Sequence, residues 1–257
     1  MSLPPPSVLA ERETRRLATI ARETALESAP CGEGWMGVDA PDSWVNFGAG
    51  LGNHLPVTDH DLQQLRDFYA SRGRRPSLRT LHYAHPTLAP ALHRAGFSLE
   101  EQDSNLVRAT APGPISLPFP LDISALDPAD EDTLSLFCQL QRAFFADGKP
   151  SPGLDATTRR VVQNPRCRWW ILRWAGEPCA AGGLELFEGG AVLIAAGTLP
   201  EFRCRGIQSA FIDFRVAEAY ALGASYCLIA SEPGGPTERN AVRRGFAPVF
   251  VTNRWRG

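Results

Sequence analysis

The most regular pattern of apolar and polar positions lies in the last third of the chain. A continuous apolar run from Ala191 to Ala196 follows a Gly-Gly pair, which is typical of a buried strand leaving a hairpin turn. A second apolar run covers Tyr226 to Ala230. Between the two runs apolar residues recur at helical spacing, and Gly223 ends the series: Ile207, Ala210, Phe211, Phe214 and Ala221. Strands joined through a helix are expected to be parallel neighbours.

The residues before this segment predict two helices and an antiparallel meander. Amphipathic spacing indicates helices over Asp130 to Phe145 and over Asp155 to Gln163. Apolar runs indicate strands over Arg168 to Trp174 and over Cys179 to Phe187, with a Gly176-Glu-Pro178 turn between them. The meander is therefore expected to lead directly into the parallel pair.

The first half of the chain shows a similar alternation of elements. Thr58-x-x-Asp61 has the spacing of a capping box, in which each side chain satisfies a backbone N–H at the start of a helix. Helices are expected over Val8 to Glu27, Thr58 to Tyr69 and Pro86 to Arg94, and strands over Ser43 to Phe47, Ser77 to Tyr83 and Asn105 to Arg108.

A proline-rich segment, Thr110 to Pro120, separates the halves, because its prolines break any regular element. We expect domains over 1–112 and 120–257, with a linker over 113–119. A weak internal repeat connects them in the order strand, proline turn, short helix, Gly-Phe, strand. Ala95-Gly-Phe97 corresponds to Arg244-Gly-Phe246, which favours a duplication.

The composition is that of a globular chain, since 257 residues at 44% hydrophobic can bury a core. A formal net charge of −2 argues against a surface that is basic throughout, although Arg239, Arg243 and Arg244 form a local cluster able to contact an anion. No apolar run is long enough to span a bilayer and the start lacks a signal-peptide layout, so we expect a cytoplasmic protein.

The six cysteines and five histidines show no metal-binding spacing and no dithiol motif, so we expect no metal site. Most of the cysteines are interpreted as small buried hydrophobes. Cys204 differs, because it lies in a basic loop before a helix, an environment that can favour the thiolate.

The junction after the first apolar run carries the clearest candidate chemistry: Gly197-Thr-Leu-Pro-Glu-Phe-Arg-Cys-Arg-Gly-Ile-Gln-Ser-Ala210. The first turn of a helix leaves N–H groups without partners and carries the positive end of the helix dipole, so such a junction binds phosphate. Arg203 and Arg205 add charge, and Gly206 removes the side chain that would block close approach. The alternative is a solvated turn whose arginines balance Glu201.

The pattern Arg203-x-x-Gly206-x-Gln208 resembles the acyl-CoA pyrophosphate loop of the GCN5-related N-acetyltransferases, whose last position is usually Gly or Ala. The resemblance covers residues 120–257 and includes Asn240-Ala-Val-Arg-Arg-Gly-Phe246. It implies an α/β (α+β) fold of two such domains, each a mixed, mostly antiparallel sheet flanked by helices. The second would carry a splayed parallel strand pair, and the first would be a degenerate copy.

By this resemblance acetyl-CoA is the cosubstrate. Main-chain N–H groups from Arg203 to Gln208 would hold its pyrophosphate, the end of the preceding strand would pair with the pantetheine arm, and Asn240 would lie near the thioester. A backbone N–H of that strand would stabilise the oxyanion. The implied cofactor-binding residues are Ala196, Gly197, Thr198, Arg203, Cys204, Arg205, Gly206, Ile207, Gln208, Ser209 and Asn240.

The family's usual acid and base are missing from their places. The tyrosine often found in the last helix is replaced by Ala241, and the carboxylate often found on the strand before the loop falls near Val192. Glu185, Glu232 and Ser231 remain as candidate catalytic residues, with surface charges as the alternative for the two glutamates. Transfer can also rely on proximity and a partly deprotonated amine.

The sequence therefore predicts an acetyl-CoA-dependent N-acetyltransferase acting on an amine of a small molecule or peptide. A non-catalytic CoA-binding sensor or scaffold is the alternative. We expect no nucleic-acid and no membrane partner, and leave a homodimer open. Gly48-Ala-Gly-Leu-Gly52 invites a dinucleotide-binding interpretation, but Asn53 holds the third glycine position and Pro56 delays the helix, which favours a glycine-rich bulge in a copy that has lost its cofactor.

Overall fold

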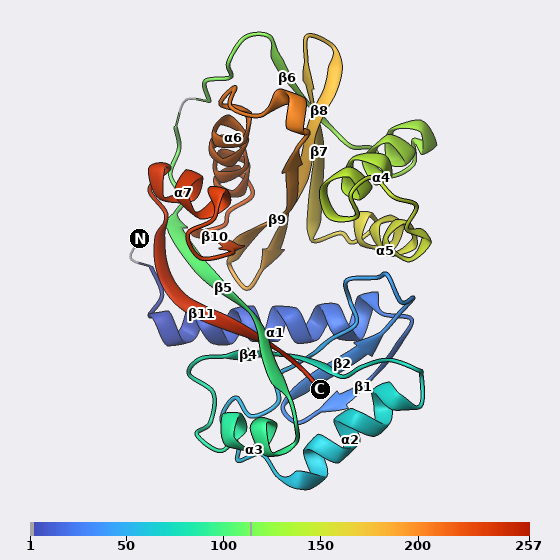
Figure 1. Cartoon of the computed structure of the whole chain (residues 1–257). Coiled ribbons are helices and arrows are strands. Elements are labelled where there is room, and N and C mark those ends of the chain that lie inside the picture. The colour runs from blue at the N-terminus through green and yellow to red at the C-terminus, as the bar shows by residue number, and fades with distance from the viewer. Residues whose placement is uncertain (1–2, 114) are drawn as a thin grey trace. The chain divides into compact units, whose positions relative to one another are not determined.

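A computed structural model describes residues 3–113 and 115–257 (Figure 1). The chain divides into two compact units. The C-terminal unit contains Leu106–Pro248, and the N-terminal unit contains Pro4–Asn105 together with Val249–Gly257. The unit limits thus fall inside two strands, β5 (Ser98–Ala109) and β11 (Ala247–Arg256), whereas the expected linker, whose residue 114 lies outside the described residues, follows β5.

The sheet of the C-terminal unit begins as an antiparallel meander and ends in a parallel pair. The meander consists of β6 (Leu121–Ala125), β7 (Cys167–Trp174), β8 (Glu177–Phe187) and β9 (Gly190–Thr198). The next strand in the sheet, β10 (Tyr226–Ser231), lies parallel to β9, as the sequence predicts.

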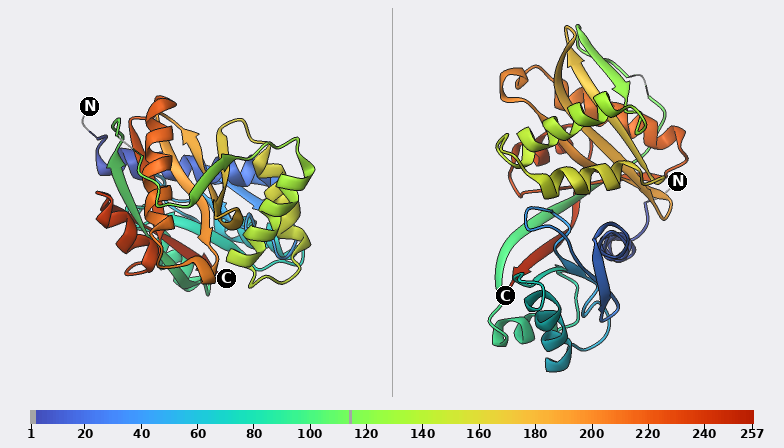
Figure 2. Two further views of the ribbon diagram at one scale, coloured as in Figure 1. Left: turned by 90° about the horizontal axis from the view of Figure 1, so that it is seen from above. Right: turned by 90° about the vertical axis from the view of Figure 1, so that its right-hand side faces the viewer.

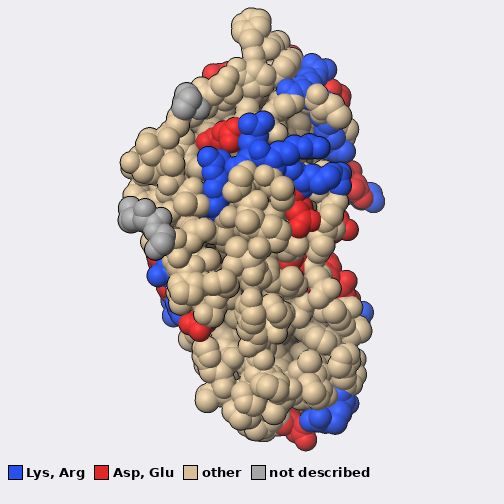
Figure 3. All heavy atoms as spheres, turned by 90° about the vertical axis from the view of Figure 1, so that its left-hand side faces the viewer, with Lys and Arg blue, Asp and Glu red and all other residues tan. Residues whose placement is uncertain are grey.

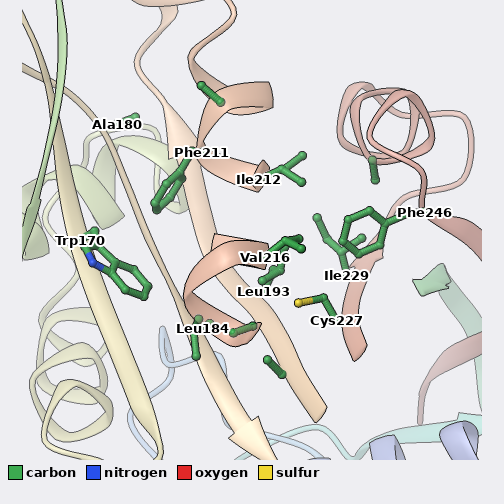
Figure 4. Packing of buried hydrophobic residues seen from close by; sticks show 14 of the residues in the cluster. Trp170, Ala180, Leu184, Leu193, Phe211, Ile212, Val216, Cys227, Ile229 and Phe246 are labelled. Carbon is green, nitrogen blue, oxygen red and sulfur yellow. The ribbon is translucent and has the colours of Figure 1, made fainter. Parts of the chain in front are cut away.

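Helices cover both faces of this sheet. In Figures 1 and 2, α4 (Glu131–Phe145) and α5 (Pro152–Val162) lie on one face and α6 (Ile207–Ala221) on the other. Figure 4 shows Phe211 of α6 pointing toward Trp170 of β7, with ring centroids 6.4 Å apart, while Val216 lies against Leu193 of β9. This apolar contact fixes the first turn of α6 at the end of β9.

The N-terminal unit repeats the plan. It contains α1 (Pro6–Thr24), β1 (Glu27–Cys31), β2 (Gly34–Val38), β3 (Gly48–Ala49), α2 (Asp59–Ala70), β4 (Ser77–Leu81) and α3 (Leu88–Arg94), followed by its share of β5 and β11. β3 and β4 are parallel, and β4 pairs antiparallel with β11, Thr252 opposite Leu81. The helix capping box of Thr58 and Asp61 is present.

The predicted repeat is confirmed by the order of elements and by matching helix ends. Both α3 and α7 (Pro236–Arg243) are followed by a glycine with positive φ, 77° at Gly96 and 81° at Gly245. The next residue, Phe97 or Phe246, donates its N–H to the carbonyl of Leu92 or Ala241 at 2.9 and 3.1 Å. Each unit therefore turns from a short helix into a long strand by the same C-cap.

The strand predicted over Ser43 to Phe47 is wrong. Side chains bond to the nearby backbone there: Asn46 accepts from the N–H of Asp39 at 2.8 Å and donates to the carbonyl of Ala40 at 2.7 Å. These local bonds compete with a strand ladder. The hairpin of β1 and β2 stands before this turn and has no counterpart in the prediction.

None of the helices within residues 3–113 and 115–257 combines the length and the apolar character needed to cross a membrane.

Candidate functional site

The parallel pair of the C-terminal unit separates after a short ladder. Cys227 pairs with Ala191 and Leu228 with Val192, and these are the pairs of β9 and β10 found in the described residues. β9 nevertheless continues to Thr198. The end of β9 therefore has an edge that β10 does not cover.

A bulge interrupts β9 beside this open edge. Gly183 of β8 pairs with Ile194, but Ala181 pairs with Gly197, so β9 has one residue more than β8 in this interval. Ala195 has a φ of 51°, and its carbonyl accepts a hydrogen bond of 3.1 Å from the side chain of Gln141 on α4. A bulge leaves its extra residue without a ladder partner and redirects the strand.

The loop after β9 begins with a 3₁₀ turn, η1 (Pro200–Phe202). The N–H of Arg203 donates to the carbonyl of Pro200 at 3.2 Å, which corrects the expectation that this amide is available to an anion. No hydrogen bond of the described residues takes up the N–H groups from Cys204 through Ser209.

The backbone of the loop presents these amides at the head of α6. Cys204 and Gly206 have positive φ values of 62° and 76°, and Gly206 is the N-cap of α6. A Cβ at Gly206 would meet nothing within 4 Å. The space in front of the amides is open, which is the geometry that an anion at a helix N-terminus needs.

These elements surround a pocket of about 800 Å³. Among the predicted cofactor residues, those that line it are Ala196, Gly197, Thr198, Arg203, Cys204, Gly206, Ile207, Gln208, Ser209 and Asn240. Arg205 is not among them. Its guanidinium lies 5.3 Å from the ring centroids of Trp174 and Phe202 and donates to the carbonyl of Glu201.

Gln208 and Asn240 join the two helices that flank the pocket. The amide of Asn240 on α7 donates to Oε1 of Gln208 at 2.7 Å, and the amide of Gln208 donates to the hydroxyl of Thr237 at 3.3 Å. Asn240 of α7 therefore lies against the first turn of α6. Thr237 is a lining residue that the sequence analysis missed, although its place in the first turn after Pro236 is a helix-start signal.

The open edge of β9 is partly occupied from within the loop. The carbonyl of Thr198 accepts a hydrogen bond of 3.2 Å from Nε of Arg203. Gly197 lies directly under the ring of Phe144 on α4, where a Cβ would come within 2.2 Å of the ring. A strand-like ligand along β9 would therefore compete with the Arg203 side chain for the Thr198 carbonyl.

The three candidate catalytic residues lie outside the pocket lining. The carboxylate of Glu185 is 3% exposed, pairs with Arg166 at 3.6 Å, and stands on β8 opposite Val192. Glu232 is exposed just after β10. Ser231 ends β10 and is buried, and its hydroxyl finds no hydrogen-bond partner in the described residues. The described residues also contain no cluster of side chains suited to a metal ion.

No protein-family model matches the sequence, and no curated protein matches it. Solved structures do match. One is a GCN5-related N-acetyltransferase from Kribbella flavida, with a TM-score of 0.71 at 15% identity over 99% of this chain and 96% of that one. Another, from Sphaerobacter thermophilus, has a TM-score of 0.60 at 12% identity over 77% and 66%. A tandem protein of this fold from the clavulanic acid biosynthesis pathway has a TM-score of 0.54 at 10% identity over 77% and 68%.

These likenesses show the fold. The chain has the mixed α/β fold of the GCN5-related N-acetyltransferases in tandem, as the sequence predicts.

Proposed function

We propose that the C-terminal unit binds acetyl-CoA and transfers its acetyl group to an amine. The observation that carries this proposal is the row of open main-chain N–H groups from Cys204 to Ser209 at the head of α6, facing a pocket beside the uncovered edge of β9. The pyrophosphate of CoA would lie on these amides. The fold of the matching acetyltransferases supports the proposal.

In this reaction the nitrogen of a neutral amine attacks the thioester carbonyl. A C–N bond forms, the C–S bond breaks, and CoA leaves as its thiol once a proton from the nitrogen has reached sulfur. Charge develops on the carbonyl oxygen, and the bulge at Ala195 is the candidate source of a main-chain N–H that meets it. Gln141 would hold this bulge in place through the Ala195 carbonyl.

None of the side chains that line the pocket is a carboxylate, and Ala241 stands where a tyrosine is usual in the family. The proposed catalysis therefore depends on positioning the amine beside the thioester and on the fraction of amine that is already neutral. The rate should rise with pH as the acceptor amine loses its proton.

Calorimetric titration with acetyl-CoA tests the binding step, and no heat at millimolar ligand would remove the proposal. Mass-spectrometric detection of acetylated products across a panel of small-molecule and peptide amines tests the transfer. Tight binding without any acetylated product would instead favour a CoA-binding sensor or scaffold.

A further inference from the structure

A second wall of the pocket is formed by one face of α7. Pro236, Arg239, Asn240 and Arg243 recur at the spacing of a single helix face, and all four line the pocket. The opposite side of the helix carries Ala241, which is fully buried. Packing therefore directs both arginines of this face toward the same space as the open amides of α6.

The arginines of the pocket have only neutral partners. Arg203 donates to the Thr198 carbonyl, Arg239 to the Gly234 carbonyl, and Arg243 to the Asn240 side chain at 3.5 Å. No carboxylate lies within ion-pair distance of these three guanidinium groups in the described residues. Arg244, the C-cap residue directly after α7, differs, since it pairs with Asp213 at 3.0 Å.

Figure 3, which shows the face that lies on the left in Figure 1, has a band of Lys and Arg side chains across its upper half, with smaller basic groups elsewhere on that face. The whole chain carries a formal charge of −2, so the positive charge at the pocket is a local feature. This charge would exceed what the proposed diphosphate requires, because the amides of α6 and Arg203 line the same pocket and would already face that group.

From this excess we infer that Arg239 and Arg243 form a second anion subsite, which binds the 3′-phosphate on the ribose of CoA and makes the protein select CoA thioesters over 3′-dephospho-CoA thioesters. The inference rests on the proposed function. A phosphate monoester carries about −1.5 to −2 charge at neutral pH and accepts paired hydrogen bonds from guanidinium groups.

The geometry allows both anionic groups of one ligand to be held. The bond between Asn240 and Gln208 brings α7 against the first turn of α6. Arg243 lies three residues beyond Asn240, which is nearly one helical turn or about 4.5 Å along the axis. A ribose can bridge such an interval between the diphosphate at α6 and a phosphate at α7.

The test compares affinities of the full chain for CoA and for 3′-dephospho-CoA by calorimetry. We expect CoA to bind about tenfold or more tightly, since charge-assisted hydrogen bonds are lost without the 3′-phosphate. The double variant R239Q/R243Q should lose most of this preference while still binding 3′-dephospho-CoA. R244Q removes one charge from the C-cap of α7, outside the pocket, and should keep the preference.

The outcomes separate the two claims. Equal affinity of the unmodified protein for the two ligands overturns the 3′-phosphate subsite and leaves the proposed function standing. Failure to bind either ligand overturns both. Loss of the preference in R244Q to the same extent as in R239Q/R243Q would show an unspecific charge effect and also overturns the subsite. The first comparison needs no variant, so it holds even if the double variant does not fold.

Discussion

Oε2 of Glu33 accepts the main-chain N–H groups of both His54 and Leu55, at 2.8 and 3.1 Å. This loop of the N-terminal unit joins β3 to α2 and corresponds to the loop between β9 and α6. The protein's own carboxylate thus takes up two amides of the loop before α2, four and three residues ahead of the N-cap Thr58. α2 also has Asp59 in its first turn and a complete capping box with Asp61, so further negative charge stands at its head.

We therefore predict that each chain binds a single molecule of CoA. A phosphate at the head of α2 would meet like charges and find the N–H groups of Thr58 and Asp61 already used. Calorimetry with a protein of known active fraction gives the stoichiometry. Two equivalent sites for each chain would contradict the contrast between the units.

Gly206→Ala is expected to weaken CoA binding about tenfold, because the new Cβ enters the space in front of the α6 amides. The positive φ of 76° adds strain, so the control must share it. Gly223→Ala is a suitable control, because Gly223 has a similar φ of 82° and an added Cβ there also meets nothing within 4 Å. Gly223 lies outside the pocket. Both variants should lose similar thermal stability, and only Gly206→Ala should lose affinity. An equal change in CoA affinity in the two variants would show that the ligand does not contact the loop at Gly206.

Cys204 is expected to be the fast-reacting thiol of the native protein. It is exposed and lines the pocket, while Cys31, Cys138, Cys167, Cys179 and Cys227 are buried. Saturating acetyl-CoA should slow the alkylation of Cys204 by iodoacetamide, because the ligand covers the loop. Peptide mass spectrometry measures the rate of alkylation. Cys204→Ser should remove the fast phase. A rate that is the same with and without acetyl-CoA would place the ligand elsewhere.

Stability should depend on Cys227 at alkaline pH. Burial raises the pKa of this thiol to about 12, despite the nearby Arg215, so the folded state keeps a proton that the unfolded state loses above about pH 9. Its contribution to the free energy of unfolding is present below that pH and falls as pH rises, by at most about 1.4 kcal/mol per pH unit.

Arg215 lies near Cys227, and burial lowers the pKa of its guanidinium. An arginine side chain keeps its proton across this pH range, so Arg215 adds no pH dependence to the comparison. Cys227→Ala isolates the thiol: urea unfolding at pH 8 and pH 10.5 should show a smaller loss of stability in the variant than in the unmodified protein. Equal losses would contradict a proton held by Cys227 in the folded state.

Local signals made the C-terminal unit predictable. Gly189-Gly190 marks the turn before β9, Gly206 the start of α6 and Gly223 its end, so strand, loop and helix follow from short stretches of sequence. The use of the Arg203 amide by Pro200 could not be predicted, because it depends on the 3₁₀ turn that Leu199 and Pro200 begin. The hydrogen bond between Gln208 and Asn240 joins positions far apart in the sequence, so no local sequence pattern predicts it.

The pairing of β11 with β4 is non-local in the same sense, and it bears on how the protein is made. Val249–Gly257 belong to the N-terminal unit, where Trp255 donates its indole N–H to the hydroxyl of Thr80 at 3.1 Å. On the ribosome the N-terminal unit therefore keeps one edge of β4 unpaired until Val249–Gly257 have been synthesised. The half synthesised first is the half completed last.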